Sequence, residues 1–158
     1  MTIKPTNTPK PREGSLLAAY MTYVSNEGIN LERFVEHGGR LLTREDATGL
    51  AAGLAHLRDK TNSLRGENPR LGRQLDFLER FFKSAPADVP EAVRNETFFA
   101  LLYAVKDVDL MPDDMPGVGF LDDAAVTEVV LSRNAREFER FCAVNDIEWA
   151  ALKPETHH

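Results

Sequence analysis

Apolar side chains recur every three or four residues along most of this chain, and this spacing decides its fold class. Between residues 70 and 83 the repeat comprises Leu71, Leu75, Leu78, Phe81 and Phe82. Residues at this spacing lie on one face of an α-helix. No segment alternates convincingly with the period of two that a half-buried strand needs. The sequence therefore predicts an all-α protein, a compact bundle of about five to six helices.

Start and stop residues set the expected helix limits. Asn30 is suited to cap a helix N-terminus, and Gly38-Gly39 is a stop signal. Pro90 suits a first helical turn, where its missing N–H costs nothing. The expected helices span residues 16–25, 30–37, 43–64, 70–83, 91–106 and 122–144, followed by a short turn at 147–152 that packs Trp149 on the body.

The chain is expected to form one domain with two short extensions. Residues 1–13 contain three prolines among polar residues, which is typical of a disordered arm. A single helical domain is predicted for residues 14–152, and residues 153–158 form a tail. Gly49 and Gly53 lie four apart on the predicted third helix and are expected to allow a neighbouring helix to approach closely.

Composition limits the classes of function. The formal net charge of -6 argues against a general nucleic-acid binder, which needs a basic face to displace phosphate counterions. No apolar run approaches the ~18 to 20 residues of a transmembrane helix, and residues 1–14 lack the apolar core of a secretory signal. Cys142 is the single cysteine and is interpreted as a small core residue. We therefore expect a cytoplasmic protein.

One segment has a composition unlike the rest. Six aspartates lie between Lys106 and Asp123, and no lysine or arginine occurs from Asp107 to Ser132. Like charges this close repel each other unless something offsets them. The same segment holds the rigid pair Pro112 and Pro116, which fix backbone dihedrals. It also holds Gly117 and Gly119, which adopt dihedrals that other residues avoid. These four residues predict a stiff, shaped hairpin between two helices.

The segment Asp-Leu-Met-Pro-Asp-Asp-Met-Pro-Gly-Val-Gly-Phe-Leu-Asp-Asp, residues 109–123, resembles the signature of the YkvA-like family of bacterial domains of unknown function. The resemblance extends over about residues 95–133. It departs from the family at Asp107, where many relatives have proline. It implies a helix–loop–helix unit and brings no assigned reaction.

The aspartates allow three interpretations. Asp122 or Asp123 would cap the last long helix while Asp109 and Asp113 accept hydrogen bonds from the loop or pair with arginines, Arg70 among them. Alternatively, Asp109, Asp113, Asp122 and Asp123 would together bind a divalent cation, which prefers carboxylate oxygens. In the third interpretation, the stiff acidic hairpin docks a basic partner protein.

These interpretations lead to two functional hypotheses. The first is a non-enzymatic interaction or regulatory module whose partner is another protein. The second is a divalent-metal-binding protein or metal-dependent enzyme that uses the same aspartates. No phosphate-binding loop, zinc-protease motif or serine-hydrolase motif occurs in the chain. The sequence therefore identifies no catalytic residue.

Overall fold

The computed structural model describes residues 22–42, 68–106 and 121–154, together with residues 45, 48, 50, 53–55, 57–59 and 61–62. All regular structure in these residues is helical, and they contain no strand, which confirms the all-α fold class. The predicted arm at residues 1–13 lies outside the described residues. So do residues 155–158 of the predicted tail.

Five α-helices and one 3-10 turn have both ends in the described part of the chain. They are α2 (Leu31–Arg40), α4 (Pro69–Ser84), α5 (Glu91–Lys106), α6 (Leu121–Arg133), α7 (Ala135–Val144) and η1 (Trp149–Ala151). Residues 22–26 and the described residues from 45 to 62 are also helical. The number of helices is thus close to the prediction, and α5 has the limits expected for it.

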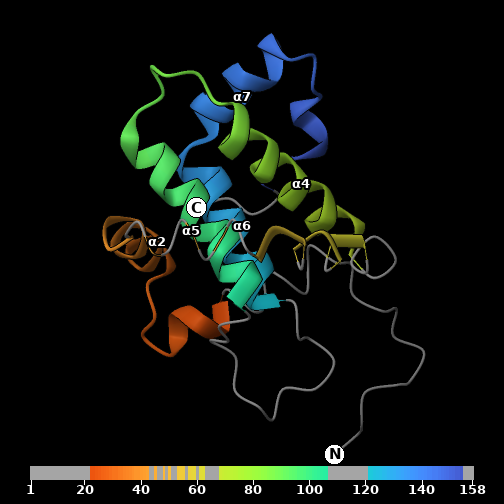
Figure 1. Ribbon diagram of the computed structural model, residues 1–158. Helices are drawn as coiled ribbons and strands as arrows, with labels where there is room; N and C mark the ends of the chain where they lie inside the picture. Colours follow the sequence, from red (N-terminus) through yellow and green to blue (C-terminus); the bar gives the residue numbers. More distant parts are fainter. Residues whose placement is uncertain are drawn as a thin grey trace, which may run out of the picture.

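The helix α6 forms the centre of the bundle. It lies beside α5, and α2 and α4 each pack against both of these helices (Figure 1). All residues from Asp122 to Leu131 are buried. A helix enclosed in this way cannot be recognised from an apolar stripe, because every face of it meets protein.

Side chains cap two of the helices. The Oδ1 atom of Asn30 accepts a hydrogen bond from the backbone N–H of Arg33 at 3.0 Å, which confirms Asn30 as the cap of α2. Asn68 caps α4 in the same way, through the N–H of Leu71 at 3.1 Å. Pro69 therefore occupies the first position of α4, where proline is favoured.

The predicted stop at Gly38-Gly39 is wrong, because α2 continues through both glycines to Arg40. A Cβ atom on Gly38 would lie 2.3 Å from the ring of Phe99 on α5. Gly38 lets α2 and α5 approach closely. The packing between these two helices keeps α2 helical beyond the glycine pair. Packing of this kind overrides local propensity.

The predicted single helix over residues 122–144 is also wrong. The chain leaves helical geometry at Asn134, with φ -118° and ψ 24°, so that α6 and α7 are separate helices. The Asn134 side-chain amide donates to the Val130 carbonyl at 2.9 Å and to a Glu96 carboxylate oxygen at 3.0 Å. Asparagine can break a helix here because its side chain offers hydrogen bonds that compete with the backbone.

Aromatic rings join α4 to α7 in the core. The ring centroid of Phe81 lies 4.8 Å from that of Phe138 and 5.1 Å from that of Phe141, both in edge-to-face geometry. Phe77 meets the same two rings at 5.6 and 6.0 Å. Cys142 is buried beside this cluster, and burial is the main cause that raises the pKa of its thiol. Its interpretation as a core residue is confirmed.

The predicted close approach at Gly53 is confirmed, while Gly49 lies outside the described residues. A Cβ atom on Gly53 would lie 2.5 Å from a methyl carbon of Val105 on α5. Valine is stiff at χ1 and cannot easily move aside.

We expect Gly53→Ala to lower the free energy of unfolding by about 1 to 2 kcal/mol, because the overpacking outweighs the helix propensity gained. Urea unfolding followed by circular dichroism would measure it. The control is Ala55→Gly on the exposed side of the same helix, which changes propensity alone. A stabilised Gly53→Ala variant would contradict the close approach.

Candidate functional site

The α5–α6 pair holds the acidic segment at its two ends. Residues 107–120 lie outside the described residues, and with them Asp109, Asp113, Pro112, Pro116, Gly117 and Gly119. The stiff hairpin and the four-aspartate metal site therefore stay predictions. The structure does describe the helices that enter and leave this segment, and their ends are tied together.

Asp122 and Asp123 lie side by side in the sequence in the first turn of α6, and both are buried. The hydroxyl of Tyr103, near the end of α5, donates to a carboxylate oxygen of Asp122 at 3.3 Å. The positive end of the α6 dipole favours two carboxylates at this position. The ring of Tyr103 also meets Phe34 of α2 edge to face at 5.9 Å. One buried tyrosine thus joins three helices at the base of the acidic segment.

A buried carboxylate further along α6 links the core to the end of the described chain. Glu128 is 1% exposed and accepts a hydrogen bond from the side-chain amide of Gln74 at 2.9 Å. Arg70 lies 3.6 Å from the same oxygen, so this arginine, one of the predicted partners for acidic residues, pairs with a glutamate. The Gln74 amide also donates to the Leu152 carbonyl at 3.0 Å.

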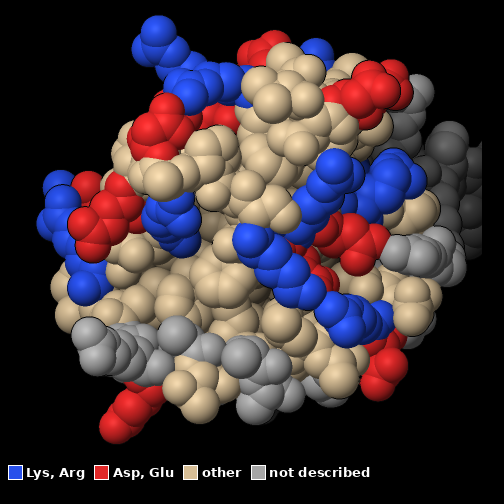
Figure 2. Space-filling view, turned by 45° about the horizontal axis from the view of Figure 1, so that its top comes forward, with Lys and Arg blue, Asp and Glu red and all other residues tan. Residues whose placement is uncertain are grey.

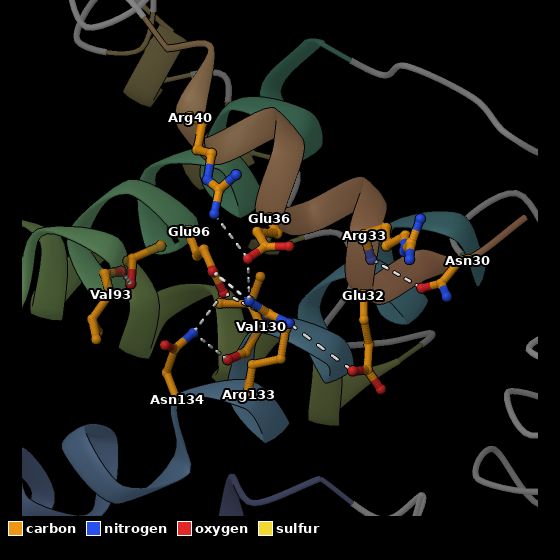
Figure 3. A network of polar contacts seen from close by, with 11 residues as sticks. Asn30, Glu32, Arg33, Glu36, Arg40, Val93, Glu96, Val130, Arg133 and Asn134 are labelled. Carbon is orange, nitrogen blue, oxygen red and sulfur yellow. Dashed lines mark hydrogen bonds and ion pairs between the residues drawn. The ribbon is translucent and has the colours of Figure 1, made fainter.

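A second buried carboxylate, Glu96 of α5, forms the centre of the network in Figure 3. Its two oxygens accept hydrogen bonds from the Arg133 guanidinium at 2.9 and 3.0 Å, in a bidentate arrangement. Glu32 and Glu36 of α2 also approach the Arg133 guanidinium, each at 4.0 Å. Arg40 of α2 bonds Glu36 at 3.2 Å. The network therefore fastens α2 to the α5–α6 pair.

The hydrogen bonds to Glu96 are the main cause that raises the pKa of Arg133. Burial acts in the opposite direction, and the negative charges of Glu96, Glu36 and Glu32 add to the increase. A hollow of about 270 Å³ opens beside the pair, between α2 and the first turns of α5. This opening leaves 27% of the Arg133 side chain exposed, against 6% for Glu96.

Sequence reasoning missed the structural roles of Tyr103, Gln74, Glu96 and Arg133. The available signal was the presence of Glu96 and Gln74 within helices that are otherwise apolar on the faces they occupy. Such residues are buried only when they are paired. The pairing itself joins residues far apart in sequence, so no local pattern reveals it.

The family comparison falls on this pair of helices. Residues 96–128 match DUF1232, a family of proteins of unknown function. The DUF1232 match begins at Glu96 and ends at Glu128, and it also contains Tyr103, Asp122 and the acidic segment between the helices. It covers a minor part of the chain. No curated protein and no solved structure matches the sequence.

The described residues alone do not form a metal-binding site. They contain no group of three or more histidine, cysteine, aspartate or glutamate side chains placed to hold an ion. Of the four predicted ligands, Asp122 and Asp123 are described, and Asp122 is engaged with Tyr103. No helix in the described part combines the length and apolar character needed to cross a membrane.

Proposed function

We propose that this protein is a non-enzymatic interaction module that presents its acidic segment, residues 107–120, to a basic partner protein. The observation that supports this proposal is the buried hydrogen bond from Tyr103 to Asp122. It ties the end of α5 to the start of α6, so the segment leaves and re-enters the bundle at fixed points. A segment whose two ends are fixed loses less conformational entropy on binding than a free chain would, and this lowers the entropic cost of association.

Charge distribution supports the same proposal. On the face in Figure 2, lysine and arginine side chains lie among aspartates and glutamates. The described residues include ion pairs such as Arg140–Asp88 at 3.0 Å and Lys83–Glu79 at 2.7 Å. The acidic segment carries Asp107, Asp109, Asp113 and Asp114 and no basic residue. A single-sign charge cluster attracts a partner of opposite charge and speeds its encounter.

The assignment of the DUF1232 match to the YkvA-like type is part of this proposal. It rests on the aspartates, prolines and glycines of residues 109–123. We also propose a bacterial cytoplasmic setting, in keeping with that family and with the single buried cysteine.

The test compares the affinities of two charge-matched variants for an oligolysine peptide. NMR chemical shifts of the protein report the binding. In the first variant, asparagine replaces the four aspartates of the segment: Asp107, Asp109, Asp113 and Asp114. In the second, amides replace four exposed carboxylates elsewhere: Asp59, Glu91, Glu139 and Glu148. We expect the first variant to lose roughly tenfold or more in affinity, and wild-type binding to weaken with salt. Equal losses in both variants would contradict the proposal.

The metal alternative is tested on the wild type and on the double variant Asp109→Asn with Asp113→Asn. Thermal unfolding is measured with EDTA and then with Ca²⁺, Mg²⁺, Mn²⁺ or Zn²⁺. A site in the acidic segment would stabilise the fold by about 2.7 kcal/mol at a hundredfold excess of ion over its dissociation constant. A metal-specific increase that Asp109→Asn with Asp113→Asn abolishes would replace the interaction module with a divalent-metal-binding function.

A further inference from the structure

The residues after α7 fold back onto the bundle as a short strap, residues 147–153. Leu152 in this strap is 5% exposed, and Trp149 packs partly buried against the core. The Gln74 amide donates to the Leu152 carbonyl, and Arg70 donates to the Lys153 carbonyl. The strap is therefore held by three apolar side chains, Ile147, Trp149 and Leu152, and by two backbone carbonyls.

The residues that hold the strap belong to the bundle. Gln74 and Arg70 lie on α4, and both also engage the buried carboxylate of Glu128 on α6. Glu128 thus orients two donors that also bond the strap. This α4–α6 site binds a main-chain segment through two successive carbonyls.

The hinge between α7 and the strap is strained. Asp146 has φ 57°, and it is the only residue other than glycine with positive φ in the described part of the chain. The Ile147 N–H bonds the Cys142 carbonyl at 2.9 Å, so Asp146 stands at the left-handed position of a Schellman motif. Glycine is the usual residue there, because side chains disfavour this conformation.

The strap also has a composition at odds with its conformation. Residues 147–153 read Ile-Glu-Trp-Ala-Ala-Leu-Lys, with no glycine or proline, and include the strong helix formers alanine, leucine, glutamate and lysine. They form only the three-residue turn η1. If Asp146 adopted helical dihedrals, α7 could extend through the hinge as far as the start of the strap. The strain at Asp146 would then be released.

We propose that this protein exchanges the strap between two copies, so that the strap of one molecule binds Gln74 and Arg70 at the α4–α6 site of the other. The opened hinge becomes helical, and the partner copy supplies Leu152 and the two carbonyls that Gln74 and Arg70 bind. Exchange recreates the contacts of the closed monomer, which makes it a low-cost route to a dimer. Short strained hinges favour such exchange.

One exposed apolar residue lies at the hinge. Val144, the last residue of α7, is 78% exposed and lies directly before the hinge. In an exchanged dimer the two hinges adjoin, so each Val144 gains a neighbouring chain to pack against. The inference involves no residue of the acidic segment, and it stands or fails separately from the proposed function.

The test varies residue 146 in the full chain and measures the mass of the assembly by light scattering after gel filtration, across a dilution series. Asp146→Gly favours the closed hinge and should remain monomeric. Asp146→Ala disfavours the left-handed conformation and favours the helix, so each hinge should open roughly tenfold more readily. Two hinges together should raise the dimer association constant roughly a hundredfold over that of Asp146→Gly.

Two spectroscopic readouts separate exchange from other dimers. Trp149 is the single tryptophan, so its fluorescence reports on the strap alone. An exchanged dimer should keep the monomer's emission, because the strap remains seated, and should gain helical circular dichroism from the opened hinge. Val144→Ser should weaken the dimer without changing the monomer's stability.

Association that does not depend on residue 146 would overturn the proposal, as would a dimer with unchanged helicity or no dimer in any variant. If Asp146→Ala fails to fold, Asp146→Asn serves in its place. After glycine, asparagine is the residue most often found at this left-handed helix end, so the closed hinge should be more stable than with aspartate and the dimer weaker than that of the wild type. A stronger dimer for Asp146→Asn would also overturn the proposal.

Discussion

Replacing Arg133 by methionine should lower the free energy of unfolding by about 3 kcal/mol. The substitution leaves the buried Glu96 carboxylate without its bidentate partner, and removing one member of a buried ion pair costs roughly 3 to 5 kcal/mol. We expect the lower end of this range, because the Arg133 side chain is 27% exposed and the Asn134 amide still donates to Glu96. Urea unfolding at neutral pH measures the loss.

Two further variants show whether the loss comes from the pair. Arg136→Met removes an exposed arginine from the neighbouring helix and should change the stability by less than about 0.5 kcal/mol. Glu96→Leu in the Arg133→Met background should recover much of the loss, because it removes the unpaired buried charge. If Arg133→Met and Arg136→Met were equally stable, the network in Figure 3 would contribute nothing to the fold.

Phe81→Ala should destabilise the protein by about 3 to 5 kcal/mol, as expected for the loss of a fully buried phenylalanine. The Phe81 ring is 0% exposed and contacts both Phe138 and Phe141 edge to face. Its removal leaves a cavity between α4 and α7 that the surrounding rings cannot fill. Thermal and urea unfolding would both report the change.

The adjacent residue supplies the comparison for this prediction. Phe82 is half-buried and meets Phe98 at a ring-centroid distance of 5.4 Å. Phe82→Ala removes the same atoms at a position that solvent already reaches, so its cost should be clearly smaller. Equal costs for the two substitutions would mean that the cluster between α4 and α7 is not the packed core that the structure shows.

The helices that could be predicted from sequence are those whose limits and faces are set locally. The apolar repeat predicts 70–83 for α4, within one residue of its observed range at each end. The same holds for the start of α2 at Asn30. Periodicity and capping are properties of neighbouring residues, so one sequence contains the information they need.

The failed predictions depend on contacts between distant residues. The chain passes through Gly38 as helix because α5 packs there, and it breaks at Asn134 where Glu96 binds the side-chain amide. The candidate site also depends on contacts between residues far apart in sequence. Sequence identified Asp122 and Asp123 by their spacing, but the bond from Tyr103 and the pairing of Glu96 with Arg133 arise only in the folded bundle.

Because other helices enclose α6, a fragment of this protein must include those helices in order to fold by itself. A fragment limited to residues 96–128 would keep Val126 and its buried neighbours but lack α2 and α4, which cover them. Apolar surface exposed in this way promotes aggregation. Glu128 would also lose Gln74 and Arg70. Expression of this fragment should therefore give insoluble material, because the smallest autonomous folding unit is larger than the stretch of sequence shared with the family.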